Sequence, residues 1–77
     1  MREYRYTIIL HPDPEEGGYA VTVPALPGCV TQGESIEEAI AMAKDAIHLH
    51  VEALLADGQE IPEEREHPQA IVVTVAA

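Results

Sequence analysis

Apolar and polar side chains alternate through the first part of the chain, and this alternation predicts β-strands. Residues 4–11 read YRYTIILH, in which every second side chain is large and apolar. Residues 19–23, YAVTV, repeat this spacing, which is typical of a strand with one covered face. The intervening segment HPDPEEGG is rich in proline and glycine and is expected to turn. The pattern therefore predicts a hairpin with strands at about 3–11 and 19–24.

The segment VPALPGCVTQGES, residues 23–35, combines turn residues with the only cysteine of the chain. Proline cannot donate a ladder hydrogen bond, so the second strand is expected to end at Pro24. A turn at the Pro-Gly dipeptide and a short third strand at 29–32 should follow. The structural positions expected here are Pro24, Pro27, Gly28 and Gly33, and the last of these should end the third strand.

A stripe of apolar residues at helical spacing comes next and predicts one long helix at about 36–57. The stripe consists of Ile36, Ala39, Ile40, Ala43, Ile47, Val51, Leu54 and Leu55. Ser35 should cap the helix by accepting a hydrogen bond from the Glu38 N–H, while the Glu38 carboxylate reaches back to the Ser35 N–H. Gly58 is suited to the position just after the helix and should end it.

Residues 70–76, AIVVTVA, are rich in valine and predict a last strand after a polar loop that contains two prolines. The element order is then β-β-β-α-β. Because helical crossovers between parallel strands are right-handed, the last strand should lie beside the first. We therefore expect one α+β domain over residues 1–77, with a four-stranded mixed sheet of order 3-2-1-4 and one helix on one face.

This expected fold leaves one face and one edge of the sheet without a cover. The candidate partner-binding residues on the open face are Arg5, Thr7, Ile9, Ala20 and Thr22. The valine-rich last strand is an apolar edge that invites pairing, and its candidate oligomer contacts are Ile71, Val73 and Val75. A core of this size rarely supplies more than about 3–5 kcal/mol, and a single cysteine excludes an intrachain disulfide. A homo-oligomer, dimer or tetramer, is therefore expected.

Charge narrows the choice of partners. The chain has 14 acidic and 4 basic side chains, for a formal net charge of -10. Direct binding of nucleic acid or of an anionic membrane is not expected, because both need clustered Lys and Arg. The acidic surface suits a basic protein partner, although acidity also serves solubility alone. The sequence has no apolar run near about 18 residues and no signal peptide, so a cytoplasmic location is expected.

Few residues suggest catalysis or metal binding. Cys29 could act as a nucleophile only with a base and a lowered pKa, and a small buried side chain is the favoured interpretation. Ser35 is explained by the helix cap. His48 and His50 lie two positions apart on the helix and face different directions, which suits metal binding poorly. We therefore expect no catalytic residue, no metal and no cofactor.

Several short motifs, in this order and spacing, resemble the HicB-type antitoxins of bacteria. They are Gly17-Gly18-Tyr19, Pro24-Ala25-Leu26-Pro27-Gly28-Cys29, Thr31, Gly33, Ser35, Glu37-Glu38-Ala39, Asp57-Gly58 and Ile61-Pro62. The resemblance covers roughly residues 4–62 and implies a degenerate RNase H-like fold. It implies that the chain binds and neutralises a small basic HicA-type toxin that cleaves messenger RNA.

Many members of this family carry a C-terminal DNA-binding segment, and this sequence stops after the last predicted strand. Promoter binding by this chain alone is therefore not expected. Two alternatives stay open: an orphan self-assembling domain with no toxin partner, and a small hydrolase that uses Cys29.

Overall fold

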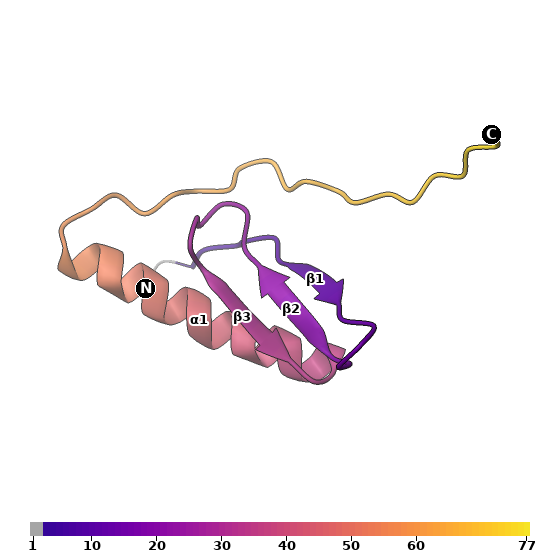
Figure 1. Cartoon of the computed structure of the whole chain (residues 1–77). Helices are drawn as coiled ribbons and strands as arrows, with labels where there is room; N and C mark the ends of the chain where they lie inside the picture. Colours follow the sequence, from indigo (N-terminus) through magenta and orange to yellow (C-terminus); the bar gives the residue numbers. More distant parts are fainter. Residues whose placement is uncertain (1–2) are drawn as a thin grey trace.

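A computed structural model describes residues 3–77 and shows an antiparallel sheet with one helix packed along it (Figure 1). The elements are β1 (Ile9–Pro12), β2 (Tyr19–Thr22), β3 (Val30–Gly33) and α1 (Ile36–Ala56). The strands lie in the order β1-β2-β3, and each pairs antiparallel with the next. The order β-β-β-α is confirmed, but the expected four-stranded sheet of order 3-2-1-4 is wrong. Residues 1–2 of the expected domain lie outside the described residues.

The register of the sheet decides which side chains meet the helix. Leu10 lies opposite Val21, which lies opposite Thr31, and directly opposed residues share a face of the sheet. Val21 is 1% exposed and packs against Ala39 and Ala43 of α1. These alanines are themselves buried, and their small side chains let the helix lie close to the sheet. The expected helix-facing side of the hairpin is therefore confirmed at these positions.

The first strand is shorter than the expected 3–11 because its partner ends early. In the observed register Ile9 lies opposite Thr22, so a longer ladder would next need residues 23 and 24 of the second strand. Pro24 has no backbone N–H and cannot extend that ladder. Residues 3–8 consequently continue as extended chain outside the sheet.

The third strand and the helix approach each other so closely that a glycine is required between them. A Cβ built on Gly33 would lie 2.6 Å from the Ala39 Cα and 2.9 Å from the Glu38 carbonyl carbon. Gly33 is buried and forms the last position of β3, whereas the sequence placed this strand at 29–32 with the glycine as its break. The glycine therefore serves the contact between strand and helix.

Residues 23–29 form a compact turn that adds a second part to the core. The Leu26 N–H donates to the Val23 carbonyl oxygen at 2.9 Å, and the Cys29 N–H donates to the Leu26 carbonyl oxygen at 3.0 Å. Val23, Leu26 and Cys29 are all buried, and Ile47 of α1 packs against them. This segment is a structural corner, in which Gly28 adopts a φ of 85°.

The helix begins and ends where the sequence predicts, with one difference in the cap. The Ser35 Oγ accepts from the Glu38 N–H at 3.1 Å, as expected for an N-cap. The Glu38 carboxylate, however, accepts from the Glu34 N–H at 3.1 Å, so the expected reciprocal bond to Ser35 is wrong. At the other end Asp57 is the C-cap and Gly58, with a φ of 68°, donates to the Leu55 carbonyl oxygen.

The valine-rich segment 70–76 belongs to no strand, and this overturns the expected fourth strand. Residues after α1 run back past the sheet as an extended chain that continues beyond β1 (Figure 1). The Glu64 carboxylate binds Thr7, which precedes it by 57 positions. The same offset from Ile9–Pro12 gives residues 66–69, which contain a charge and a proline rather than the valines. Anchored in this way, the apolar segment passes the end of its own sheet.

Candidate partner-binding surfaces

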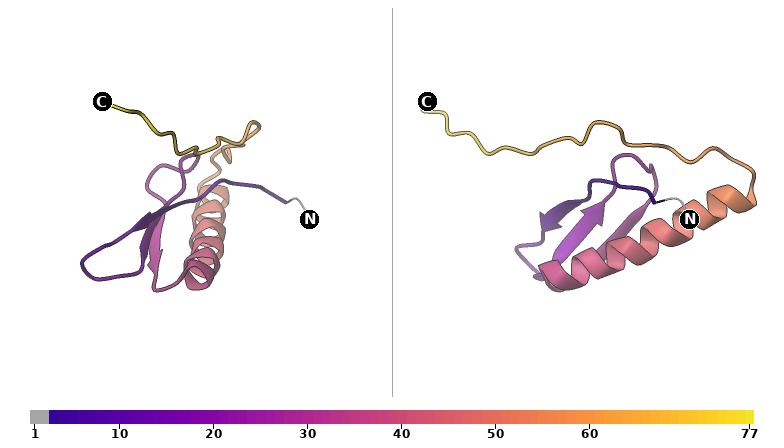
Figure 2. Two further views of the ribbon diagram at one scale, coloured as in Figure 1. Left: turned by 90° about the vertical axis from the view of Figure 1, so that its right-hand side faces the viewer. Right: turned by 180° about the vertical axis from the view of Figure 1, so that it is seen from behind.

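One face of the sheet carries no helix, and Figure 2 shows it from the side, with α1 packed on the opposite face. The cross-strand pairs of this open face are Ile9 with Thr22, His11 with Ala20, Thr22 with Val30, and Ala20 with Gln32. Val30 is 65% exposed and Ile9 37% exposed, so the face offers apolar area to a partner.

The structure gathers three of the five predicted partner-binding residues, Ile9, Ala20 and Thr22, on this face. Val30 and Gln32 also lie on this face and are not among the five predicted residues. Alternation along the third strand, combined with an antiparallel register, was the signal that could have found them.

Acidic side chains border one end of this face. Four carboxylates line a hollow of about 280 Å³ between the hairpin tip and the start of α1. They belong to Asp13, Glu16, Glu34 and Glu38, and the same hollow is lined by Ala20 and Gln32 of the open face. The open face therefore continues directly into a negatively charged region, which favours a basic partner.

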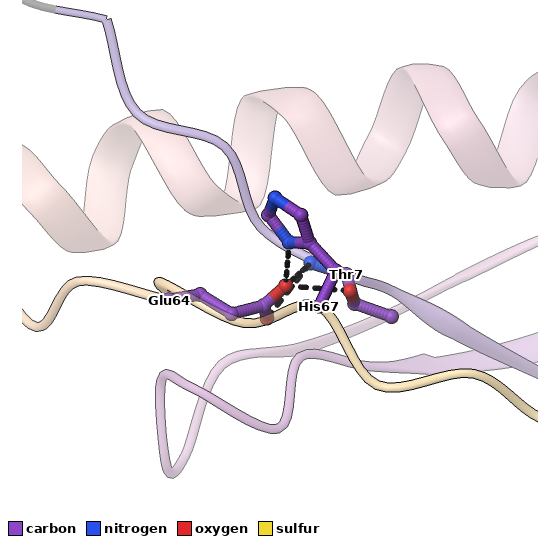
Figure 3. Close-up of polar contacts among 3 residues, drawn as sticks. All are labelled: Thr7, Glu64 and His67. Atoms are coloured by element: carbon purple, nitrogen blue, oxygen red, sulfur yellow. Dashed lines mark hydrogen bonds and ion pairs between the residues drawn. The ribbon is translucent and has the colours of Figure 1, made fainter.

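Thr7, a fourth predicted residue, is occupied by the returning chain. Its N–H donates to the Glu64 Oε1 at 3.0 Å and Oε2 at 3.1 Å, and its hydroxyl donates to Oε2 at 2.6 Å. The His67 Nδ1 is in contact with the same carboxylate (Figure 3). We call Thr7, Glu64 and His67 the tail latch. No local pattern in the sequence indicates the latch, because the three residues meet only after the chain has folded back.

The latch keeps its carboxylate charged. The Glu64 side chain is only 7% exposed. Burial by itself would raise the pKa of this carboxyl group, but the hydrogen bonds from Thr7 and the contact with His67 outweigh burial and hold the pKa below its ordinary value. Beside it, the Tyr6 hydroxyl donates to the Pro62 carbonyl oxygen at 2.5 Å, which ties a second point of the returning chain to the N-terminal segment.

Arg5, the fifth predicted residue, borders an apolar groove between the N-terminal segment and α1. This groove has a volume of about 540 Å³. Its apolar lining comprises Tyr4, Tyr6, Ile8, Ile40, Ala43, Ile47 and Val51, and its polar lining comprises Arg5, Lys44 and His48. Two of the four Lys and Arg side chains of the chain thus lie at this one groove.

The predicted oligomer contacts lie on the tail that follows the latch, residues 70–77. Ile71 is 74% exposed, Val73 is 75% exposed and Val75 is 81% exposed. They form no strand, so their role as contacts stays a prediction.

The side chains considered for catalysis do not form a reactive site. Cys29 is 4% exposed, and burial raises the pKa of its thiol. A cysteine nucleophile needs the opposite, an accessible thiol with a lowered pKa. Within residues 3–77, no group of three His, Cys, Asp or Glu side chains is placed to hold a metal ion. The same residues contain no helix that is long and apolar enough to cross a bilayer.

Comparison with known proteins decides the family. Residues 6–73 match the family described as the HicB-like antitoxin of bacterial toxin–antitoxin systems. The chain belongs to this family. A UPF0150 protein of Thermoplasma acidophilum is 44% identical over 69 residues, which are 90% of this chain and 96% of that protein.

Proteins named as antitoxins are also similar. Antitoxin HicB of Escherichia coli K12 is 41% identical over 58 residues, which cover 75% of this chain and 41% of that antitoxin. The crystal structure of the N-terminal domain of antitoxin HicB from Burkholderia pseudomallei has a TM-score of 0.66 and 36% identity, and the match covers 83% of this chain and 72% of that one. The chain thus corresponds to about two fifths of the length of the E. coli antitoxin.

Membership of this family indicates an antitoxin role with a toxin as the kind of partner, and a role that is not enzymatic. The resemblance read from the short motifs is confirmed. The cytoplasmic location stays a prediction.

Proposed function

We propose that this HicB-like chain binds and neutralises a small basic HicA-type toxin that cleaves messenger RNA. The observation that carries the proposal is the open sheet face of a family member, exposed and continuous with an acidic hollow. A basic ribonuclease holds RNA through its cationic surface, so an acidic cover on that surface would exclude the substrate. No chemistry by the antitoxin is needed, which agrees with the burial of Cys29.

The first test is to identify the partner. Tagged chain is used to capture proteins from a lysate of its source cells, and the eluate is analysed by mass spectrometry. We expect a small basic protein in equal amount that cleaves RNA only after release from the complex. A partner without ribonuclease activity, or no partner, would contradict the proposal.

The second test locates the interface with a matched pair of variants. Ala20→Arg places a long cation on the open face, and Ala41→Arg places the same cation on an exposed position of α1. A basic partner on the open face should bind the Ala20 variant at least about tenfold more weakly, because like charges meet at the interface. The Ala41 variant should bind within about twofold of the unmodified chain.

Isothermal titration with the purified toxin measures both affinities, and stopped-flow mixing measures the association rate. Association should slow as salt is raised, because electrostatic steering is screened. Equal affinities of the two variants would place the toxin elsewhere on the chain.

A further inference from the structure

The tail is an apolar segment without a cover. Val72 is 97% exposed, and each of its apolar neighbours Ile71, Val73 and Val75 is at least 74% exposed. Residues 68–77 contain no charged side chain. The molecule has a radius of gyration of 14.6 Å, against about 11–12 Å for a compact chain of this length. The difference reflects the tail, which runs clear of the domain (Figure 2).

The apolar groove between the N-terminal segment and α1 is the matching surface. Its lining is mainly apolar, and its volume of about 540 Å³ lies in the range of ligand pockets, about 300–1,000 Å³. Ile40, at this groove, is 40% exposed and is one of the apolar helix residues that lack a cover.

The tail latch keeps each tail away from the groove of its own chain. Glu64 is fixed beside Thr7, and Tyr6 is tied to the Pro62 carbonyl oxygen, so the chain leaves the N-terminal segment at this point. Residues 71–75 begin seven positions later, which is about 23 Å along an extended chain. A return to residues 4–8 would need a full reversal within residues 65–70, and this segment has only a bend at Glu66 and contains no glycine.

Charge at the groove discriminates between possible occupants. Arg5 and Lys44 are among its lining residues, and His48 lies with them. A basic toxin would be repelled there, since like charges at an interface oppose binding. An uncharged apolar strand would be accepted, and the tail of a second copy is such a strand.

We propose that two copies of this chain exchange tails, so that Ile71, Val73 and Val75 of each copy occupy the apolar groove of the other. The exchange is reciprocal, because both copies carry the same tail and the same groove, and it closes as a two-fold dimer. It leaves the open sheet face free, so the dimer does not depend on the toxin proposal.

Two substitutions by aspartate, each of which changes the side-chain volume only slightly, test the exchange. The dimer dissociation constant of the full chain is measured by sedimentation equilibrium. In an extended segment Val73 and Thr74 point to opposite sides. Val73→Asp should raise the dimer dissociation constant by about 100-fold, because a charge replaces a buried valine. Thr74→Asp adds the same charge to the outward side and should stay within about threefold. Both substitutions lie outside the core, and circular dichroism confirms that each monomer is folded.

Cross-linking then tests which chain supplies the tail. In a Cys29→Ala background, one copy carries Val73→Cys and a second, tagged copy carries Ile40→Cys. Mild oxidation should give a disulfide between the two copies, and Thr74→Cys in place of Val73→Cys should give little.

Three results would overturn the exchange. A chain that is monomeric at all micromolar concentrations has no exchanged tail. A dimer that tolerates Val73→Asp as well as Thr74→Asp uses another surface. A disulfide that forms within a single chain carrying both cysteines, at high dilution, would show that the tail reaches its own groove. Failure to bind a toxin would leave all three measurements unchanged, so the two proposals fail separately.

Discussion

Replacement of Gly33 by alanine should destabilise this chain more than the same replacement at Gly17, Gly28 or Gly58, whose surroundings are open. The added Cβ would lie 2.6 Å from the Ala39 Cα, whereas ordinary contact begins at 3.4 Å. Strand and helix must therefore separate by at least about 0.8 Å, since the Ala39 N lies closer still, and the obstructing atoms belong to the helix backbone, which cannot rotate aside. Overpacking of a well-packed core typically costs about 1–3 kcal/mol, and a rigid backbone places this site at the upper end.

Part of that loss is offset in the unfolded chain. Alanine restricts the unfolded state more than glycine does, which stabilises by about 0.4–1 kcal/mol. A net loss of about 2–2.5 kcal/mol is expected for Gly33→Ala. The total stability of a domain this size is about 4–12 kcal/mol, so the loss is a large share of it.

Gly28→Ala provides the matched control, because it isolates conformational strain from steric conflict. A Cβ at Gly28 would meet nothing within 4 Å, but its φ is 85°. The left-handed conformation costs alanine about 1–2 kcal/mol, and the smaller conformational freedom of the unfolded chain offsets part of this cost. A net loss of about 1 kcal/mol is therefore expected. Urea unfolding followed by circular dichroism at one fixed protein concentration measures both variants. A Gly33→Ala variant as stable as Gly28→Ala would refute the steric argument.

Three further outcomes follow from the cap, the latch and the buried thiol. Ser35→Ala should lower the free energy of unfolding by about 1 kcal/mol, because it removes the acceptor for the Glu38 N–H, and an unchanged urea midpoint would contradict the cap. The lowered pKa of Glu64 means that the latch adds stability above the ordinary glutamate pKa of about 4.3 and loses it as the pH falls through the folded-state value. The Thr7 amide resonance should report this loss in an NMR pH titration, and Glu64→Gln should abolish the dependence. Cys29 should react with a thiol reagent at least about tenfold more slowly in the native chain than in urea, because it is buried and its pKa is raised, and equal rates would show an accessible thiol.

The elements with strong local signals could be predicted from the sequence. Ser35 marks the start of the helix and Gly58 its end, because caps depend on nearby backbone groups. The alternation around Val21 correctly separates the covered face of the hairpin from the open one. Each of these features depends on residues that are close along the chain or on a simple period.

The predictions that proved wrong concern segments whose position is set by residues far away along the chain. The segment 70–76 has high strand propensity, but propensity does not say which strand it pairs with, or whether any does. The contact of Glu64 with Thr7 aligns charged and proline positions with β1, and no local pattern indicates that contact. The close approach at Gly33 was likewise hidden, because a strand-breaking glycine and a glycine under a helix look identical in sequence.

The location of the core along the chain has a consequence for proteolysis. All side chains of the two core clusters come from residues 6–47, so cleavage between α1 and the tail latch removes no side chain of the core. Residues 59–63 are mostly exposed and belong to no helix or strand, and such segments are the preferred sites of proteolytic cleavage. A chain cut there keeps every residue that lines the apolar groove and loses the tail. Under the proposed exchange it could accept the tail of another copy but could not supply one in return, so a single cut would end reciprocal pairing while the core stays intact.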